Sequence, residues 1–194
     1  GRYFSNQLEK LIIFSAPSGS GKTTVVKHLL EVMSNQLAFS VSATTRSPRP
    51  GETDAKEYHF LSIEDFNQNV ADNQFLEYEE VYAGILYGTL WSEVKKIWAD
   101  GKAVVFDVDV IGGISLKEYF KENSISIFIK PPRIEALRER LKKRNADDRK
   151  AIKNRIEKSF EEMKSIDKFD KIIVNDELSI STKKIIEIVE KFLK

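Results

Sequence analysis

Four short apolar runs recur along the chain, and helical patterns separate them. The runs are rich in Ile, Val and Phe and do not alternate with polar residues, which is typical of parallel strands buried on both faces of a sheet. Strands that alternate with helices predict a doubly wound α/β fold, in which ligands bind at the carboxyl ends of the strands. The runs are residues 11–15, 103–108, 125–129 and 171–174.

Three segments have the spacing of an amphipathic helix, with apolar residues on one face. The first follows residue 21 and the second, residues 134–143, begins after two prolines. The third covers residues 182–193. The apolar face of the first helix is expected to consist of Val25, Val26, Leu29, Leu30 and Met33.

The middle of the chain, from residue 39 to about residue 90, has shorter apolar segments mixed with turn signals. Its pattern predicts a small, mainly β insert over the carboxyl edge of the sheet, with one short helix at 62–70. Ser62 is the expected N-cap of that helix, and Asp65 occupies its third position. The strands expected here are residues 39–42, 58–61, 75–81 and 87–89.

Composition narrows the possible functions. The 194 residues are 41% hydrophobic and 31% charged with a net charge of +1, which suits a globular protein that binds neither nucleic acid nor a membrane surface. The absence of cysteine excludes disulfides, thiolate metal sites and a cysteine nucleophile. No signal peptide or transmembrane-length apolar stretch is evident, so we expect a soluble, cytoplasmic protein. Its oligomeric state is left open.

The segment after the first apolar run reads Ala16-Pro17-Ser18-Gly19-Ser20-Gly21-Lys22-Thr23 and opens the first helix. A strand, a Gly-rich turn, Gly-Lys-Thr and a helix together make a phosphate-binding P-loop. Backbone N–H groups and the helix N-terminus there attract phosphate, Lys22 is expected to reach the β- and γ-phosphates, and the Thr23 hydroxyl is expected to bind Mg²⁺. Ala16 stands where the pattern has its first glycine. The segment predicts a nucleotide-binding chain.

Two further groups of residues have the chemistry of a phosphate or metal site. Arg46 and Arg49 lie three residues apart around a proline, and guanidinium groups suit bidentate recognition of phosphate. Asp107 and Asp109 end an apolar strand, where carboxylates are costly unless they meet a cation or hydrogen-bond donors. The residues alone do not exclude that the two arginines are ordinary surface residues of a polar loop. Nor do they exclude that the two aspartates are solvated carboxylates at the end of a strand.

The string Ser-Val-Ser-x-Thr-Thr-Arg-x-Pro-Arg-x-Gly-Glu at 40–52, followed by Tyr-His-Phe at 58–60, resembles guanylate kinase. Phe-Leu-Glu-Tyr at 75–78, Tyr-Gly-Thr at 87–89, Asp-Val-Asp at 107–109 and Val-Asn-Asp at 174–176 resemble the same family in the same order. The resemblance runs from about residue 9 to residue 193. It implies an ATP:GMP phosphotransferase with a P-loop core (9–38, 91–132 and 159–194), a GMP-binding domain (39–90) and a helical lid (133–158).

The resemblance also implies a role for individual residues. For GMP, Arg46, Arg49, Tyr58 and Tyr87 would hold the phosphate, Ser42, Glu77 and Thr89 would read the guanine, and Asp107 would lie beside the nucleotide. A carboxylate can accept from both the N1–H and the N2–H₂ of guanine, whereas adenine offers no such donor pair. Pattern alone does not distinguish Glu77 from Glu79 and Glu80. The expected Mg²⁺ ligands, partly through water, are Thr23, Asp107 and Asp109.

For ATP, the resemblance points to the P-loop, to arginines of a basic lid and, on the adenine side, to Asn175. Closure of such a lid would exclude water and bring positive charge to the transferred phosphoryl group. The residues assigned to catalysis are Lys22, Arg46, Arg140 and Arg155. Those assigned to ATP are Ala16, Pro17, Ser18, Gly19, Ser20, Gly21, Lys22, Thr23, Thr24, Arg140, Arg144 and Asn175.

The chain departs from the family pattern at several positions. The lid reads Arg144-Asn145-Ala146 where Arg-Gly-Thr is usual, and Ala55 replaces a usual Gly. Ile111 replaces a common Gln, and the loop between Glu77 and Tyr87 is one residue longer than in many members. These departures affect rates and lid closure more than they affect phosphate binding.

Other functions are also compatible with a P-loop. A guanylate-kinase-like module that binds a phosphorylated peptide typically has a degraded P-loop, whereas Gly19, Gly21 and Lys22 are intact here. A P-loop kinase for another phosphorylated acceptor would leave Glu77 and Thr89 without a purpose. A plain NTPase would not explain the second arginine pair.

Overall fold

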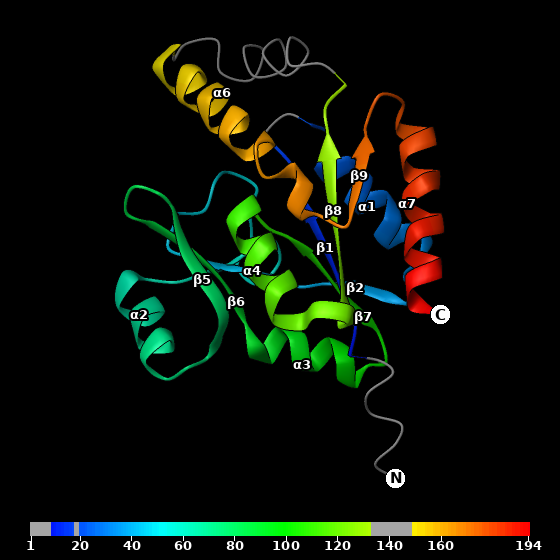
Figure 1. The fold of residues 1–194 in the computed structure, drawn as a ribbon. Coiled ribbons are helices and arrows are strands. Elements are labelled where there is room, and N and C mark those ends of the chain that lie inside the picture. Colours follow the sequence, from blue (N-terminus) through cyan, green and yellow to red (C-terminus); the bar gives the residue numbers. More distant parts are fainter. Residues whose placement is uncertain (1–8, 18–19, 133–148) are drawn as a thin grey trace. The chain divides into compact units, whose positions relative to one another are not determined.

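The computed structural model describes residues 9–17, 20–132 and 149–194 of this mixed α/β chain (Figure 1). These residues divide into two compact units. The first unit takes in residues 9–10 and 35–105, and the second takes in the described residues of 11–34 and 106–194. Strand β7 (Ala103–Asp107) begins in the first unit and ends in the second.

The second unit is built on parallel strands. β1 (Leu11–Ser15) pairs in parallel with β8 (Ser124–Lys130), with Leu11 opposite Ser124, and β8 pairs in parallel with β9 (Lys171–Val174). The end of β7 lies beside β1, because the N–H of Val108 donates to the carbonyl of Phe14 at 3.1 Å. Every residue of β1 is buried, and β8 is buried up to its last residue. Both strands therefore confirm the predicted burial on two faces.

β9 is the exception to that prediction. It is the last strand in the order of the sheet, and Ile173 is its one buried residue. Ile172 and Val174 share the opposite face of the strand and are 45% and 49% exposed. An apolar run thus located this strand correctly, but burial on both faces was wrong for it, because no described residues cover the face that carries Ile172 and Val174.

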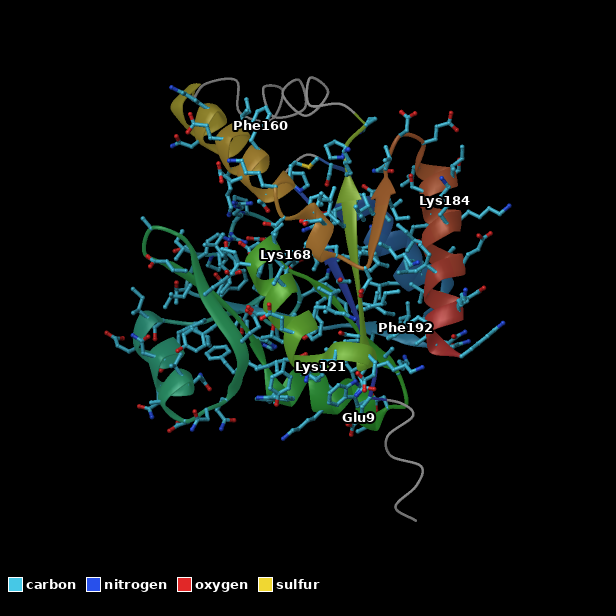
Figure 2. The ribbon with its side chains drawn as sticks, in the orientation of Figure 1. Glu9, Lys121, Phe160, Lys168, Lys184 and Phe192 are labelled. Carbon is cyan, nitrogen blue, oxygen red and sulfur yellow. The ribbon has the colours of Figure 1, made fainter. Side chains whose placement is uncertain are left out.

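Helices cover both faces of the parallel strands (Figure 1). α4 packs on β1 and β8, whereas α1 contacts β1 and α7, and α7 contacts β9. The apolar face predicted for α1 is confirmed, with Leu30 half-buried and its other members buried. α7 begins before residue 182, and Phe192 near its end is half-buried (Figure 2). The described α-helices of this unit are α1 (Lys22–Val32), α4 (Val110–Phe120), α6 (Arg149–Met163) and α7 (Leu178–Leu193).

The first unit contains a second sheet of four strands in the order β4-β3-β6-β5. β6 pairs antiparallel with β3 and β5, and β3 pairs in parallel with β4. Phe66 of α2 stacks on Phe75 at 4.4 Å between ring centroids, and both pack on Ala43 as a small core. The elements of this part are β3 (Ala43–Thr44), β4 (His59–Phe60), α2 (Ile63–Ala71), β5 (Phe75–Tyr82) and β6 (Ile85–Leu90).

The first unit also contains β2 (Leu37–Phe39), which pairs in parallel with β7, and α3 (Trp91–Ala99). The predicted strand at 39–42 is wrong, because residues 40–42 carry the chain from β2 to β3. The predicted N-cap is confirmed: the Oγ of Ser62 accepts from the N–H of Asp65 at 3.0 Å. The predicted helix at 134–143 lies outside the described residues. In the described ranges, no helix is both long and apolar enough to cross a lipid bilayer.

Ala55 adopts a left-handed backbone conformation, with φ of 67°. A side chain in that conformation costs about 1 kcal/mol or more, which exceeds the extra entropy that glycine loses on folding. We therefore expect Ala55→Gly to raise the free energy of unfolding by about 0.5 kcal/mol, measured by urea denaturation. Ala83→Gly, at an exposed turn residue outside the left-handed region, is the control and should bring no gain. An equal gain at both positions would contradict the explanation.

Candidate functional site

The P-loop pattern lies between β1 and α1. Ala16 and Pro17 are buried after the strand, and α1 begins at Lys22. Gly21 precedes the helix with φ of 84°, a conformation that favours glycine. Ala16 is only 7% exposed, so its methyl group is packed inside the protein at the position where the pattern has glycine. Ser18 and Gly19 lie outside the described residues.

The N-terminus of α1 is suited to an anion. Its first turn carries no acidic residue, and Thr23 and Thr24 are exposed there. The first N–H groups of a helix have no partners within the helix and carry partial positive charge. Because no carboxylate of that turn neutralises this charge, it is available to phosphate oxygens.

Asn175 holds the P-loop from the end of β9. Its Nδ2 donates to the carbonyl oxygen of Ser20 at 2.8 Å, and the residue is only 7% exposed. A Cβ on Gly21 would lie 2.5 Å from the same Nδ2, so a larger residue there would displace the amide that holds Ser20. The Oδ1 of Asn175 is buried and has no hydrogen-bond partner among the described residues. The structure thus brings Asn175, predicted on the adenine side, against the P-loop itself.

The two aspartates after the apolar part of β7 have different environments. Asp107 ends the strand and forms an ion pair with the Nζ of Lys22. Asp109 lies beyond the strand and caps α4, with its Oδ1 accepting from the N–H of Gly112 at 3.1 Å. The Oγ of Ser15 donates to the backbone carbonyl oxygens of Val108, at 2.9 Å, and of Asp109, at 3.2 Å. Both carboxylates are therefore held, one by a cation and one by a helix N-terminus.

α6 contributes two charged residues that the sequence patterns did not indicate. The Nζ of Lys158 lies 3.9 Å from the Oδ2 of Asp109. Burial raises the pKa of Glu162 to about 7; Asp109 adds to this rise, whereas Lys158 and Lys22 oppose it. Lys158 and Glu162 are four residues apart in α6, so their side chains lie on one face of the helix. Sequence alone does not show that this face meets the carboxyl end of β7.

Arg46 is held by a carboxylate in the first unit. Its two terminal nitrogens donate to Glu52 at 2.8 and 3.0 Å, and the N–H of Arg49 donates to the same carboxylate at 2.7 Å. The hydrogen bond with Arg46 is the main cause that lowers the pKa of Glu52 to about 2, and the same bond raises the pKa of Arg46. The sequence includes Glu52 only as the last residue of a motif, whereas in the structure it fixes the loop that carries both arginines.

Aromatic rings adjoin this arginine. The guanidinium carbon of Arg46 lies 5.1 Å from the ring centroid of Tyr58 and 5.7 Å from that of Phe60. The ring of Tyr87 packs edge-on against Tyr58 at 5.8 Å. Three of the residues predicted to hold the GMP phosphate, Arg46, Tyr58 and Tyr87, are thus neighbours. Arg49 belongs to the same loop through its backbone contact with Glu52.

Glu77 and Thr89 face each other across β5 and β6. They form a registered pair, and the Oγ1 of Thr89 donates to Glu77 Oε1 at 2.8 Å. Thr89 is fully buried and Glu77 is half-buried. Ser42, the third residue predicted for guanine, is half-buried, and its carbonyl accepts from the N–H of His59. The arrangement provides a fixed carboxylate beside a hydroxyl.

Several predicted residues stand outside this description. Arg140, Arg144, Asn145 and Ala146 lie in the range that the structure does not describe. Arg155 falls within α6, but its side chain is not described. Ile111, where Gln is common, is 66% exposed on α4.

Known proteins resemble the chain over nearly its whole length. A sequence model of the guanylate kinase family matches residues 8–192. The guanylate kinase of Bacteroides fragilis is 50% identical over 184 residues, covering 95% of this chain and 90% of that protein. That of Porphyromonas gingivalis is 46% identical over 186 residues, covering 96% and 99%. The crystal structure of guanylate kinase from Anaplasma phagocytophilum has a TM-score of 0.78 at 28% identity, covering 95% and 86%. The chain therefore belongs to the guanylate kinase family.

Proposed function

We propose that the chain transfers the γ-phosphoryl group of Mg²⁺-bound ATP to GMP, giving GDP and ADP. Its family makes it an ATP-dependent nucleoside monophosphate kinase. The observation that carries the choice of acceptor is the Glu77–Thr89 pair, a fixed carboxylate and hydroxyl in the unit that also holds Arg46. A kinase that consumes these two nucleotides works where both are made, so we also assign it to the cytoplasm.

On the donor side, Lys22 and the N-terminus of α1 are the proposed ligands of the ATP phosphates. The free N–H groups of the first helical turn and the ammonium of Lys22 provide the positive charge that the β- and γ-phosphates need. Asp107, the last residue of β7, holds that ammonium in an ion pair. This contact supports the proposal that the Lys22 ammonium lies at the carboxyl end of β7. Asn175 is proposed to act on this side by fixing Ser20 and Gly21.

Mg²⁺ is the implied cofactor, and the oxygen-bearing residues at the end of β7 suit it. Asp107 and Asp109 offer carboxylates and Thr23 offers a hydroxyl, which are the hard oxygen ligands that Mg²⁺ prefers. The described residues contain no group of three potential metal-ligating side chains from His, Cys, Asp and Glu. Mg²⁺ usually keeps several waters and completes its shell with substrate phosphates, so this set is sufficient. When bound, the ion would neutralise charge on the transferred group.

On the acceptor side, Arg46, Arg49, Tyr58 and Tyr87 are the proposed ligands of the GMP phosphate. Glu52 supports this role, because it holds the guanidinium of Arg46 through both terminal nitrogens. The same carboxylate fixes the backbone of Arg49, so the two arginines are oriented by one group. Preorganised cations spend little entropy when they bind an anion.

Guanine is the proposed base because of what the Glu77–Thr89 pair can accept and donate. Thr89 uses its hydroxyl proton on Glu77 Oε1, and because a carboxylate accepts several hydrogen bonds at once, Glu77 can also accept from the N1–H and N2–H₂ of guanine. Adenine lacks that pair of donors and would leave the carboxylate desolvated without compensation. Ser42 is the third proposed contact to the base.

The proposed reaction needs no general base. An oxygen of the GMP phosphate, which already carries charge, attacks the γ-phosphorus in line, and the bond to the β-γ bridging oxygen breaks to release ADP. Catalysis then consists of positioning and charge stabilisation. We assign these to Lys22 on the donor and Arg46 on the acceptor, with Arg140, Arg144 and Arg155 of the proposed lid at 133–158.

An assay with several acceptors tests the function. ADP formation is followed in a coupled assay with Mg²⁺·ATP and GMP, AMP, CMP, UMP or no acceptor. We expect turnover with GMP, at least about 100-fold lower kcat/KM with the other monophosphates, and none without acceptor, because only guanine satisfies Glu77. Equal rates with AMP and GMP would contradict guanine recognition. ATP binding without turnover on any monophosphate would favour the phosphopeptide-binding alternative.

A further inference from the structure

We propose that Ser15 is a positioning residue for Mg²⁺·ATP, an inference that rests on the proposed function. Its hydroxyl group joins the strand that leads into the P-loop to the acidic segment, residues 107–109, which carries Asp107 and Asp109. The proposed phosphate ligands and the proposed Mg²⁺ ligands are thereby held in one arrangement. Ser15 belongs to none of the residue sets that the sequence motifs assign to a nucleotide or to the metal.

Ser15 lies between the sheet and the P-loop. It is the last residue of β1, it is fully buried, and Ala16 of the P-loop follows it directly. Its Oγ lies 2.9 Å from the carbonyl oxygen of Val108 and 3.2 Å from that of Asp109. Because a serine hydroxyl has one proton, the two carbonyls share it in a bifurcated hydrogen bond. One side chain of β1 therefore contacts two consecutive peptide groups of the acidic segment.

The acidic segment is also tied to β1 and to the P-loop by other atoms. The N–H of Val108 donates to the carbonyl of Phe14 at 3.1 Å. Asp107, at the start of the segment, forms its ion pair with Lys22. A shift of the segment away from β1 would therefore change where both carboxylates lie relative to the Lys22 ammonium.

Gly113 provides the space for the Ser15 hydroxyl group. It lies near the start of α4, and its N–H donates to the carbonyl of Asp109 at 2.9 Å. A Cβ at this position would lie 2.6 Å from Ser15 Oγ, closer than a real Cβ approaches another atom. Glycine destabilises a helix interior relative to alanine, so helix stability does not explain its presence. The space that Ser15 needs does explain it, because an alanine would force the hydroxyl away from the two carbonyls.

A second buried serine of the sheet offers a comparison, because its hydroxyl serves the structure alone. Ser126 of β8 is 1% exposed, and its Oγ donates to Asp170 Oδ2 at 3.2 Å and accepts from the N–H of Asp170 at 3.0 Å. Asp170 directly precedes β9, at the amino end of that strand, whereas ligands of such sheets bind at the carboxyl ends. Loss of either hydroxyl should lower stability, but only the loss at Ser15 should change the binding of Mg²⁺·ATP.

Calorimetry tests the inference with Ser15→Ala, with Gly113→Ala, with the two combined and, as a matched loss of a buried hydroxyl, with Ser126→Ala. Kd for ATP is measured with Mg²⁺ and with EDTA, and Tm checks folding. We expect Ser15→Ala to weaken binding of Mg²⁺·ATP about tenfold and of metal-free ATP less than about twofold, because the displaced carboxylates act on the nucleotide through the metal. Gly113→Ala should also weaken mainly the binding of Mg²⁺·ATP.

The double variant separates displacement of the hydroxyl from a general disturbance of α4. Once residue 15 has no hydroxyl, a methyl group at residue 113 has no oxygen to displace. The double variant should therefore bind Mg²⁺·ATP as Ser15→Ala does, rather than show the product of the two losses. Ser126→Ala should lower Tm and keep both Kd values of the parent.

Three results would overturn the inference. They are a Mg²⁺·ATP Kd for Ser15→Ala within about twofold of the parent, an equal loss with and without Mg²⁺, and the same loss in Ser126→Ala. A double variant in which the two losses multiply would overturn the role of Gly113.

Phosphoryl transfer to GMP by the parent protein is measured in parallel, so that the two proposals can fail separately. If the parent transfers the phosphoryl group and Ser15→Ala binds Mg²⁺·ATP normally, only the role of Ser15 fails. If the parent does not transfer it, the proposed function fails.

Discussion

Lys22→Ala is expected to lower kcat for transfer from ATP to GMP by at least about 100-fold, comparable to the loss of a principal transition-state donor in other enzymes. The variant loses the ammonium at the N-terminus of α1. It also leaves Asp107 without its ion-pair partner, so a carboxylate faces the incoming phosphates unopposed. The measurement is a steady-state assay of ADP formation at saturating GMP.

Lys27→Ala is the matched control, because Lys27 is an exposed residue of the same helix. It should retain parental kcat. Lys22→Ala should still bind GMP, which we assign to other residues, and should melt close to the parent. If Lys22→Ala kept kcat within tenfold of the parent, Lys22 would not be the residue that stabilises charge on the transferred group.

Glu77→Gln is expected to reduce the preference for GMP over AMP, measured as the ratio of kcat/KM values, by about 1–3 kcal/mol or roughly 5- to 150-fold. The glutamine amide keeps one oxygen that accepts from Thr89 or from guanine. Its NH₂ group is a donor, however, and cannot accept from the N1–H or N2–H₂ of the base. The hydroxyl of Thr89 is buried and cannot turn to water instead. The loss should therefore fall on guanine recognition more than on kcat with saturating GMP.

Glu80→Gln separates this effect from a general loss of negative charge in β5. Glu80 accepts from the N–H of Gly84 at 2.6 Å, which a glutamine carbonyl can also do. It should leave the preference for GMP unchanged. An unaltered GMP-to-AMP ratio in Glu77→Gln would show that Glu77 does not read the base.

The sequence predicted best those features that depend on local physical rules. Strand β1, the left-handed Gly21 and the start of α1 follow from an apolar run and a turn that only certain residues can form. The Ser62 cap of α2 is similarly local. The strand expected at 39–42 failed because apolar character does not show which partner strand each residue joins. The N–H of Ser40 donates to the carbonyl of Val105 in β7, the strand that pairs with β2. Ala43, only three residues later, pairs with Gly88 in β6.

The charged groups of the site were predictable only in part. Lys22 and Asp107 came from motifs, and the structure pairs them. Glu52 lay in a recognised string, but its bidentate hold on Arg46 depends on the turn at 47–51, whose path the sequence does not give. Lys158 and Glu162 look like ordinary members of a solvated basic helix. Their position near Asp109 depends on the packing of Met163 in a core formed by distant residues.

The contact between Gly21 and Asn175 links two positions that lie far apart in the sequence. A methyl group at residue 21 would occupy the space of the Asn175 amide, and a shorter residue at 175 would leave the Ser20 carbonyl without its donor. Substitutions at the two positions are therefore non-additive. In the evolution of this P-loop, a change at residue 175 alters the space around residue 21, whereas the φ of 84° at residue 21 favours glycine whatever residue stands at 175.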